Sequence, residues 1–252
     1  MKISIITATF NSEKTIQSCL QSVESQDYDN IEHIIIDGKS TDKTCKLLNR
    51  YAENNPRVTY ISEKDEGIYD ALNKGIKMAK GEFIGFLHSD DEYFSSQTIS
   101  KIASVLNKNN VDGIYGDLNY ISSTNSNNVL RYWKSRVFQQ KLLTKGWMPP
   151  HPTLFLKKDV YDQHGLFDLS FKIAADYDYI LRIFKDVSLR FVYIPEIITN
   201  MRIGGASSST KNLKNKMLED IRALRKNQFT KPYSVVLRKN MSKLPQLFKS
   251  KK

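Results

Sequence analysis

The first 120 residues alternate between short apolar runs and longer amphipathic stretches. The apolar runs are typical of buried strands, and they predict strands over residues 3–7, 31–36, 58–61, 83–87 and 112–120. Apolar residues at helical spacing predict helices over residues 13–25, from about 43 to 52, 68–79 and 98–107. This alternation predicts an α/β protein with a mostly parallel, Rossmann-like sheet flanked by helices.

The pattern changes after residue 121. Residues 122–128 form a polar turn or loop, and the strands expected beyond it, over 129–133, 153–156 and 189–194, are predicted to be antiparallel. Helical patterns cover residues 160–161, 175–184 and 211–228. Because no repeat and no second core is evident, we expect residues 1–205 to form one domain, followed by a basic C-terminal helix and tail over residues 206–252.

Two adjacent carboxylates, Asp90 and Asp91, follow the predicted strand at 83–87. Ligands of open α/β sheets bind beyond the carboxyl ends of the strands. Hard oxygen ligands at such an edge suit Mg²⁺ or Mn²⁺ holding a diphosphate, so Asp90 is the candidate metal ligand. The alternative is a solvated Asp-Asp turn, and the strand context favours the metal site.

Further groups of matching chemistry follow the four early strands. A right-handed winding brings them to one edge of the sheet, and they are Ala8, Phe10, Asp37, Lys64, Asp65, His88 and Ser89. An aromatic ring, a separate carboxylate and a lysine are what a nucleotide diphosphate needs. Phe10 is predicted to stack on a base, and Asp37 to accept a hydrogen bond from its imino N–H. Taken singly, each residue has a structural alternative as a turn, core or surface residue.

Several segments carry a family resemblance: ISIITATFN at 3–11, IIIDGKSTDKT at 34–44, DEGIYDALNKGIKMAKGEFIGFLHSDD at 65–91, YGD at 115–117, HPTLF at 151–155 and AADYDYILR at 174–182. With them the chain resembles the family 2 glycosyltransferases of the GT-A fold, among them bacterial transferases that build O-antigen, capsule and glycolipid saccharides. The likeness runs to about residue 205. It implies that residues 1–120 bind the nucleotide sugar, with Ala8, Phe10 and Asp37 in the nucleotide pocket and Asp90 on the metal. It also implies that residues 121–205 supply the acceptor site and the general base, Asp176.

The chain departs from the family's D-x-D element, because His88 stands where its first carboxylate does. We expect His88 to hydrogen-bond a ribose hydroxyl, and a role as metal ligand is the alternative. The Q-x-x-R-W element and the membrane helices of the processive synthases are missing. Their absence points to transfer of a single sugar.

The second half of the chain must provide the base and the acceptor contacts. An inverting transfer needs one base to take the proton of the acceptor hydroxyl. Asp176 and Asp178 lie near a predicted helix start, where one of them has a helix-capping alternative. Trp147 is a candidate for stacking on an acceptor sugar, and His151, Asp91 and Asp178 are candidates for acceptor or diphosphate contacts. A structural histidine is the alternative for His151.

The net charge of +11 lies entirely in the last fifth of the chain. Residues 201–252 contain 14 Lys and Arg against two acidic residues, whereas residues 1–200 are nearly neutral. No motif that reads nucleic acid accompanies this charge, and a basic amphipathic helix favours an anionic membrane surface. The two cysteines are expected to be reduced, and no secretion signal or run of about 20 apolar residues is evident. These features predict a cytoplasmic protein, peripheral at the inner face of the cytoplasmic membrane.

Together these features predict an inverting transferase that depends on Mn²⁺ or Mg²⁺ and moves one sugar from a UDP-linked donor. The resemblance implies a saccharide acceptor on a polyprenyl diphosphate, in the biosynthesis of a surface polysaccharide such as O-antigen or capsule. One alternative is a nucleotidyltransferase, but residues 8–14 are not the Gly-rich basic loop that such an enzyme needs. The other alternative is a nucleotide-sugar-binding protein without catalytic activity.

Overall fold

The computed structural model describes residues 1–204 and 210–242. Its strands are β1 (Ile3–Thr9), β2 (Ile31–Asp37), β3 (Val58–Ser62), β4 (Phe83–Phe86), β5 (Glu92–Tyr93), β6 (Gly113–Ile121), β7 (Val129–Trp133), β8 (Phe155–Lys157) and β9 (Phe191–Arg202). Its helices are α1 (Ile16–Glu24), α2 (Thr44–Glu53), α3 (Ile68–Met78), α4 (Thr98–Lys108), α5 (Lys158–His164), α6 (Ala175–Lys185), α7 (Thr210–Lys226) and α8 (Pro232–Met241), with 3₁₀ turns η1 (Gln140–Lys145) and η2 (His151–Thr153). The predicted α/β class is confirmed.

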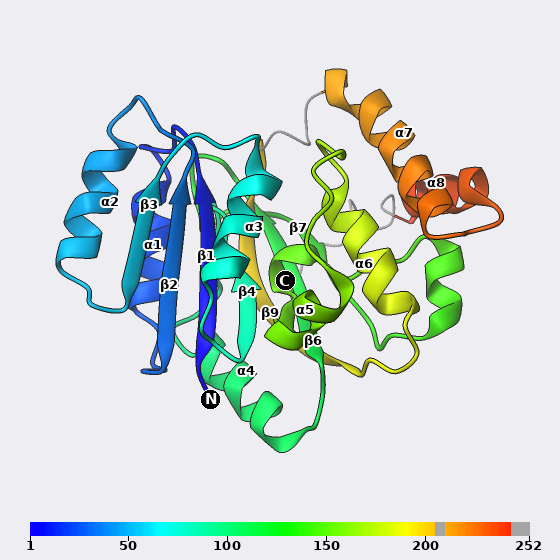
Figure 1. Ribbon diagram of the computed structural model, residues 1–252, viewed down its shortest axis with the longest axis horizontal. Coiled ribbons are helices and arrows are strands. Elements are labelled where there is room, and N and C mark those ends of the chain that lie inside the picture. The colour runs from blue at the N-terminus through cyan, green and yellow to red at the C-terminus, as the bar shows by residue number, and fades with distance from the viewer. Residues whose placement is uncertain (205–209, 243–252) are drawn as a thin grey trace.

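The N-terminal half is a parallel sheet in the order β3-β2-β1-β4. Helix α3 packs on one face of this sheet, while α1, α2 and α4 pack on the other (Figure 1). The buried residues of β2 alternate between these two faces, since Ile34 and Ile36 contact the α3 side and Ile35 contacts α1 and α2. All four strands therefore end at the same edge, where the sequence predicted the site.

The second half continues the same sheet with a change of direction. Strand β8 lies antiparallel between β4 and β6, so β6 runs in the same direction as β4 without touching it. The expectation of an antiparallel strand near residues 189–194 is wrong in its main pairing, because β9 is parallel to β6 from Gly113↔Phe191 to Ile121↔Arg202. Only the end of β9 is antiparallel, where it pairs with the short β5.

A glycine allows the two halves of the sheet to meet. A Cβ atom on Gly85 of β4 would lie 2.3 Å from the ring of Phe155 on β8. The aromatic ring thus occupies the space that any other residue would fill, and it is itself fully buried. The short apolar run FIGF is therefore a strand whose glycine is fixed by close packing.

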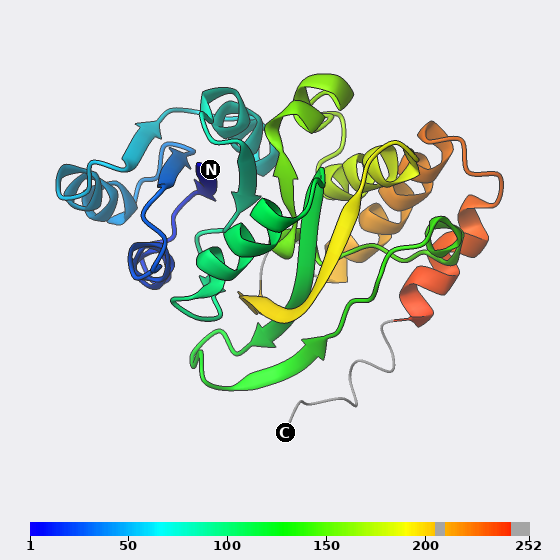
Figure 2. The same ribbon diagram turned by 90° about the horizontal axis from the view of Figure 1, so that it is seen from below.

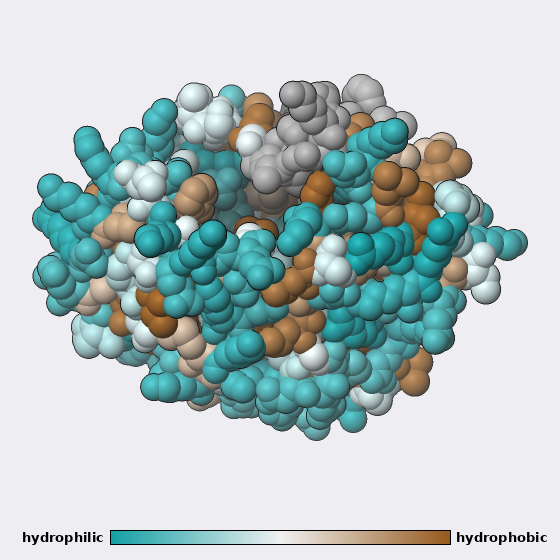
Figure 3. Space-filling model, turned by 45° about the horizontal axis from the view of Figure 1, so that its top comes forward, coloured by the Kyte–Doolittle hydropathy of each residue, from teal (hydrophilic) through white to brown (hydrophobic). Residues whose placement is uncertain are grey.

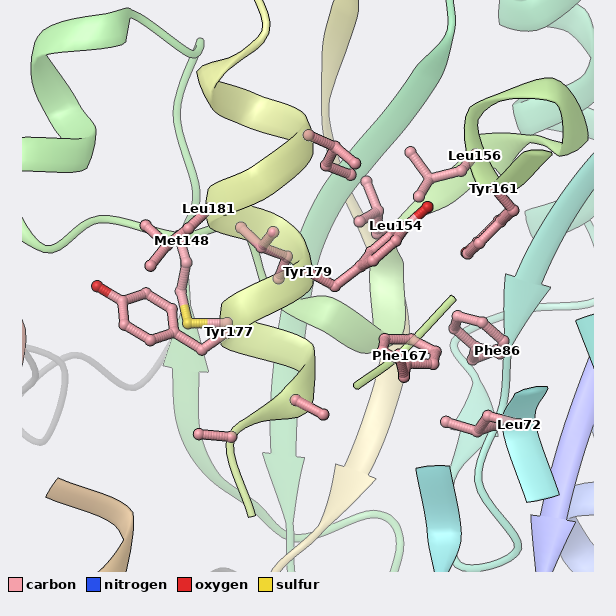
Figure 4. Packing of buried hydrophobic residues seen from close by; sticks show 14 of the residues in the cluster. Leu72, Phe86, Met148, Leu154, Leu156, Tyr161, Phe167, Tyr177, Tyr179 and Leu181 are labelled. Carbon is pink, nitrogen blue, oxygen red and sulfur yellow. The ribbon is translucent and has the colours of Figure 1, made fainter. Parts of the chain in front are cut away.

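Helix α6 is the centre of the larger hydrophobic core. Figure 4 shows Tyr177 and Met148 on one side of this helix and Tyr179, Tyr161 and Phe167 on the other. Tyr161 and Tyr179 stack with ring centroids 5.2 Å apart. This packing on both sides fixes the rotation of α6 about its axis, and with it the direction of the acidic residues in its first turn.

The C-terminal helices are part of this core. Helices α7 and α8 lie beside α6, at the end of the molecule opposite α2 (Figures 1 and 2). Their residues Ala223, Leu224, Val235 and Val236 are buried in the same cluster as α6. Val235 and Val236 therefore stabilise the fold and are not available to contact a membrane. In the part of the chain that the structure describes, no helix is both long and apolar enough to cross a bilayer.

Candidate active site

Three loops converge at the edge where β1, β2 and β3 end. A Cβ atom on Gly38 would lie 2.7 Å from Oδ2 of Asp65 and 3.4 Å from the ring of Phe10, so these residues lie side by side. The Phe10 ring is 61% exposed and open to stacking. Ala8 is buried beneath this edge, whereas Lys64 is exposed. The side of the molecule that carries this edge is hollowed and largely hydrophilic (Figure 3).

Asp37 is fixed at the end of β2 by four donors. Its Oδ2 accepts hydrogen bonds from Ser40 N at 3.0 Å, Ser62 Oγ at 2.6 Å and Cys45 Sγ at 3.3 Å. Its Oδ1 accepts from Ser40 Oγ alone among the described residues, which leaves an acceptor lone pair. The structure thus holds the carboxylate in a set orientation beside Phe10 and Asp65.

The two aspartates after β4 face different surroundings. Asp91 is fully buried and its Oδ1 accepts from Arg202 N at 3.1 Å. Burial and the neighbouring Asp90 charge raise the pKa of Asp91 well above its usual value. Asp90 is half-buried and makes no hydrogen bond or ion pair with the residues that the structure describes. The Oδ2 atom of Asp91 is buried without a hydrogen-bond partner among the described residues, and the role of Asp91 as a ligand contact stays a prediction.

Two histidines connect the end of β4 with the start of α6. The rings of His88 and His151 have centroids 5.8 Å apart, and His151 Nδ1 lies 3.3 Å from Asp176 Oδ2. The buried Nδ1 of His88 has no hydrogen-bond partner among the described residues. Burial lowers the pKa of His88, against the opposing charges of Asp90 and Asp176. His88 therefore lies within electrostatic reach of both the predicted metal ligand and the predicted base.

Asp176 is oriented by a hydrogen bond from Tyr69 and lies next to His151. Tyr69 of α3 donates its hydroxyl to Asp176 Oδ1 at 3.1 Å, and also bonds the backbone oxygen of Ile173 at 2.8 Å. Burial lowers the pKa of His151 to about 4, so at neutral pH the ring is uncharged. The neutral ring thus lies beside the carboxylate, with Nδ1 3.3 Å from Asp176 Oδ2. Sequence reasoning missed Tyr69, because nothing in the amphipathic pattern of α3 distinguishes it from a core residue.

The charge state of Asp176 follows from its surroundings. Burial by itself raises the pKa of this carboxyl group. The positive charge that His151 gains only near pH 4 and below, together with the charges of Lys239 and Lys216, outweighs burial and holds the pKa of Asp176 below its usual value. Asp176 is therefore ionised at neutral pH, as a general base must be.

Asp178 faces away from this group. It is fully buried and paired with Arg182 at 2.6 Å and Lys226 at 3.1 Å, and Asn227 Nδ2 donates to it at 2.9 Å. The structure thus joins α6 to α7 through Asp178, and the suggestion that it contacts an acceptor is wrong. Residues two positions apart on a helix point about 200° apart, a signal that was present in the sequence.

A cavity of about 350 Å³ opens beside Asp176. Trp147 lines it while packing edge-on against Tyr115 and Phe184, so this ring has both a structural and a cavity-facing role. Further residues on its wall were not predicted to belong to a site, and they are Tyr120, Arg131, Trp133, Lys134, Arg136, Lys145, Lys216 and Lys239. On the other side of the histidine pair, Ser89 is buried and its Oγ lies 2.8 Å from that of Ser12.

The residues present fit a divalent ion held jointly with a substrate. No group of three His, Cys, Asp or Glu side chains able to hold a metal occurs among the described residues. Mg²⁺ in nucleotide sites is held by one or two carboxylates together with substrate phosphates and water. Asp90, a carboxylate that bonds no described residue, offers the oxygen ligand that such an ion requires.

Comparison with known proteins places these residues in a family. The family model "Glycosyl transferase family 2" matches residues 4–165. The chain belongs to glycosyl transferase family 2. It is 29% identical over 209 residues to the PGL/p-HBAD biosynthesis glycosyltransferase of Mycobacterium tuberculosis, covering 82% of this chain and 79% of that protein. An uncharacterised glycosyltransferase of the same species is 33% identical over 184 residues, covering 71% and 68%.

The solved structures support the same fold. Staphylococcus aureus TarS 1–349 in complex with UDP-GlcNAc has a TM-score of 0.68 at 18% identity, covering 98% of this chain and 78% of that one. A mannosyltransferase from Pyrobaculum calidifontis, in complex with GDP-Man and Mn²⁺, has a TM-score of 0.68 at 18% identity, covering 98% and 73%. The GT-A fold is thus confirmed. The family match identifies the protein as a glycosyltransferase, which decides against the nucleotidyltransferase and the binding protein without activity.

Proposed function

We propose that this glycosyltransferase uses a nucleotide-diphosphate sugar, UDP-linked, and transfers one sugar with inversion to a saccharide acceptor. The observation that carries the proposal is the line of side chains from Asp90 through His88 and His151 to Asp176. It sets an unpaired carboxylate at the end of β4 close to an ionised carboxylate at the start of α6. Nucleotide sugars bound by the TarS and mannosyltransferase structures support the choice of donor class.

In this proposal the edge formed by Phe10, Asp37 and Asp65 holds the nucleotide. Phe10 stacks on the base, and Asp37 Oδ1 accepts from the base through its remaining lone pair. His88 hydrogen-bonds the ribose through its Nδ1, an atom that bonds no described residue, while Ser89 and Lys64 lie close to the phosphates. Residues 1–120 thus bind the donor and residues 121–205 provide the base and the acceptor side.

Asp176 acts as general base. It takes the proton of the acceptor hydroxyl while that oxygen forms its bond to the anomeric carbon. The bond from the anomeric carbon to the diphosphate oxygen breaks on the opposite face, and its electron pair leaves with the nucleotide diphosphate. Tyr69 holds the carboxylate in place by a hydrogen bond to Oδ1, and His151 lies beside Oδ2. No covalent enzyme intermediate is needed, because one displacement inverts the configuration.

Asp90 would hold a divalent ion, Mn²⁺ or Mg²⁺. When bound, this ion offsets the negative charge of the leaving diphosphate. The mannosyltransferase structure with Mn²⁺ supports this cofactor. Asp91 contributes to the same loop by bonding Arg202 of β9 and so fixing the backbone next to Asp90.

For the acceptor we propose a saccharide linked to a polyprenyl diphosphate, at the inner face of the cytoplasmic membrane, in the assembly of a surface polysaccharide. Support comes from α7, whose residues Leu213, Met217 and Leu218 are exposed. The segment from residue 201 to 252 also carries nearly all the excess positive charge of the chain. Apolar residues next to basic ones favour binding to an anionic membrane surface.

A donor panel tests the proposal. Purified protein with Mn²⁺ is incubated with UDP-, GDP- and dTDP-sugars, and release of the nucleoside diphosphate is measured. We expect release from a UDP-sugar, lost on chelation of the metal and in Asp90→Ala. Release of diphosphate that persists unchanged in Asp90→Ala would contradict the metal assignment. Release of UDP from none of the UDP-sugars in the panel would contradict the donor assignment.

A further inference from the structure

The cavity beside Asp176 is strongly cationic. Its wall carries six lysine and arginine side chains against two acidic ones, Asp176 and Asp220, counting the described residues. The cations are Arg131, Lys134, Arg136, Lys145, Lys216 and Lys239. Like charges gathered around one cavity repel one another, so such an arrangement is stable when a bound anion offsets them.

Most of these charges are not neutralised by the protein. Lys239 is paired with Asp220 at 2.9 Å, with its Nζ also 3.3 Å from the centroid of the Tyr177 ring. Lys134, Arg136, Lys145 and Lys216 have no carboxylate within 4.0 Å among the described residues. Four positive charges thus remain to meet a ligand, at the cavity where Asp176 would receive the acceptor proton.

The cations come from four different parts of the chain. Lys134 and Arg136 follow β7, Lys145 ends η1, Lys216 lies on α7 and Lys239 on α8. The family model ends at residue 165, so Lys216 and Lys239 belong to a part of the chain outside the family match. The C-terminal helices therefore add charge to the acceptor side of a site whose donor side is built by the family domain.

An aromatic face accompanies the charges. Tyr120 of β6 and Trp133 of β7 are stacked with an interplanar angle of 3° and ring centroids 6.4 Å apart. The guanidinium of Arg131 lies 4.6 Å from the centroid of Tyr120. Flat aromatic rings beside a planar guanidinium form a surface that suits a sugar ring carrying an anionic group.

We propose that this cavity is an anion-selective acceptor subsite, which binds a saccharide with a phosphate or a carboxylate close to its reactive hydroxyl. The inference rests on the proposed function, because it takes Asp176 as the base. The four lysine and arginine side chains without a carboxylate partner recognise the anion. Their positive charges also offset the repulsion that Asp176 would otherwise exert on a negatively charged acceptor.

Saturation-transfer NMR with three small probes tests the inference on the full-length protein, with UDP and diamagnetic Mg²⁺ present in excess to occupy the donor side. The probes are glucose 1-phosphate, methyl glucuronide and the neutral methyl glucoside. We expect saturable binding of at least one anionic probe and at least tenfold weaker binding of the neutral one. Preference for the phosphate indicates an acceptor read through its lipid diphosphate or another phosphate ester, and preference for the carboxylate indicates an acidic sugar.

Matched variants identify the responsible residues. Lys145→Met with Lys216→Met removes two cavity charges, and Lys141→Met with Lys214→Met removes two charges from the same η1 and α7 outside the cavity. The first pair of substitutions is expected to weaken binding of the anionic probe about tenfold or more. The second pair is expected to weaken it less than about twofold. Arg136→Met serves as an independent third variant if the first pair does not fold.

The outcomes separate this inference from the proposed function. Equal binding of neutral and anionic probes, no binding of any probe, or equal loss in the two matched pairs would overturn the anion subsite. A parallel titration with UDP reads the donor side. If UDP fails to bind while the anionic probe binds as expected, the donor assignment fails and the anion subsite stands.

Discussion

Asp176 and Asp178 are two residues apart on α6, yet they have opposite surroundings. Asp176→Asn is expected to lower transfer about 10²- to 10⁴-fold, because the amide cannot accept the acceptor proton. Asp178→Asn is expected to lower the free energy of unfolding by about 1–3 kcal/mol, because Arg182 and Lys226 lose their buried partner. Transfer assays and thermal melts of both variants check this contrast. Reduced stability in the first variant with normal transfer would reverse the two roles.

The ionisation of Asp176 predicts the pH profile of transfer. Its pKa lies below the usual value of 3.8, so the base stays ionised as the pH falls towards 5. His151 has a pKa of about 4 and stays neutral over the same range. We therefore expect that the titration of these two groups changes kcat/KM for the acceptor by less than about twofold between pH 7 and pH 5. A midpoint between pH 6 and 7, measured where the protein remains folded, would instead implicate a protonated histidine.

For single residues, the sequence predicted the position of those that directly follow a strand of the parallel sheet. Phe10, Asp37 and Asp65 could be placed because parallel strands bring the residues after them to one edge. The contact of His151 with Asp176 could not be predicted, since it depends on how α6 is rotated against η2. The hydrogen bond to Asp91 could not be predicted for a similar reason: its donor, the Arg202 backbone, belongs to β9 and lies 111 residues away.

Among the elements, the four parallel strands and their helices follow from local patterns, whereas the second half depends on long-range pairing. Strand β9 has the same apolar content whether it runs parallel or antiparallel to β6, so its direction was not determined by its own sequence. Helix α8 was not predicted from the sequence, for a different reason. Its apolar residues stand among lysines and arginines, which are typical of a solvated tail as much as of a helix with one buried face.

Helix α8 can be tested by residues that are neighbours in sequence. Val235 and Val236 are buried at 3% and 2% exposure, whereas Leu237 is 61% exposed. Val235→Ala with Val236→Ala is expected to cost about 2–4 kcal/mol of unfolding free energy, because both leave cavities in the core. Leu237→Ala is expected to change it by less than about 0.5 kcal/mol. Denaturant titration compares them, and equal effects would mean that α8 is not packed as described.

At the level of the whole molecule, the structure changes the interpretation of where the positive charge lies. The excess of positive charge after residue 200 looked like the property of a tail. In the structure, part of this segment returns to the catalytic domain as α7 and α8, and Lys216 and Lys239 line the cavity beside Asp176. The same charges thus bear on the acceptor, while residues 243–252 of the predicted tail lie outside the described residues.

The apolar residues of α7 differ in their exposure from one end of the helix to the other. Those near its end, Ala223 and Leu224, are buried, whereas Leu213 and Leu218 are more than half exposed. If the exposed ones contact lipid, Leu213→Ser with Leu218→Ser costs on the order of 2–3 kcal/mol of binding, which lowers recovery with anionic vesicles at least about tenfold. Vesicle flotation of the full-length protein measures this loss.

The control replaces two exposed apolar residues away from α7. Val137 and Val187 are 67% and 83% exposed, so Val137→Ser with Val187→Ser removes comparable apolar surface without touching the helix. Recovery of this control should equal that of the unchanged protein, and raised salt should weaken both, since basic residues act through the surface potential of the vesicle. If the α7 variant floats as well as the control, the acceptor must reach the site without the helix binding lipid. The cationic cavity would then have to select the acceptor without help from the membrane.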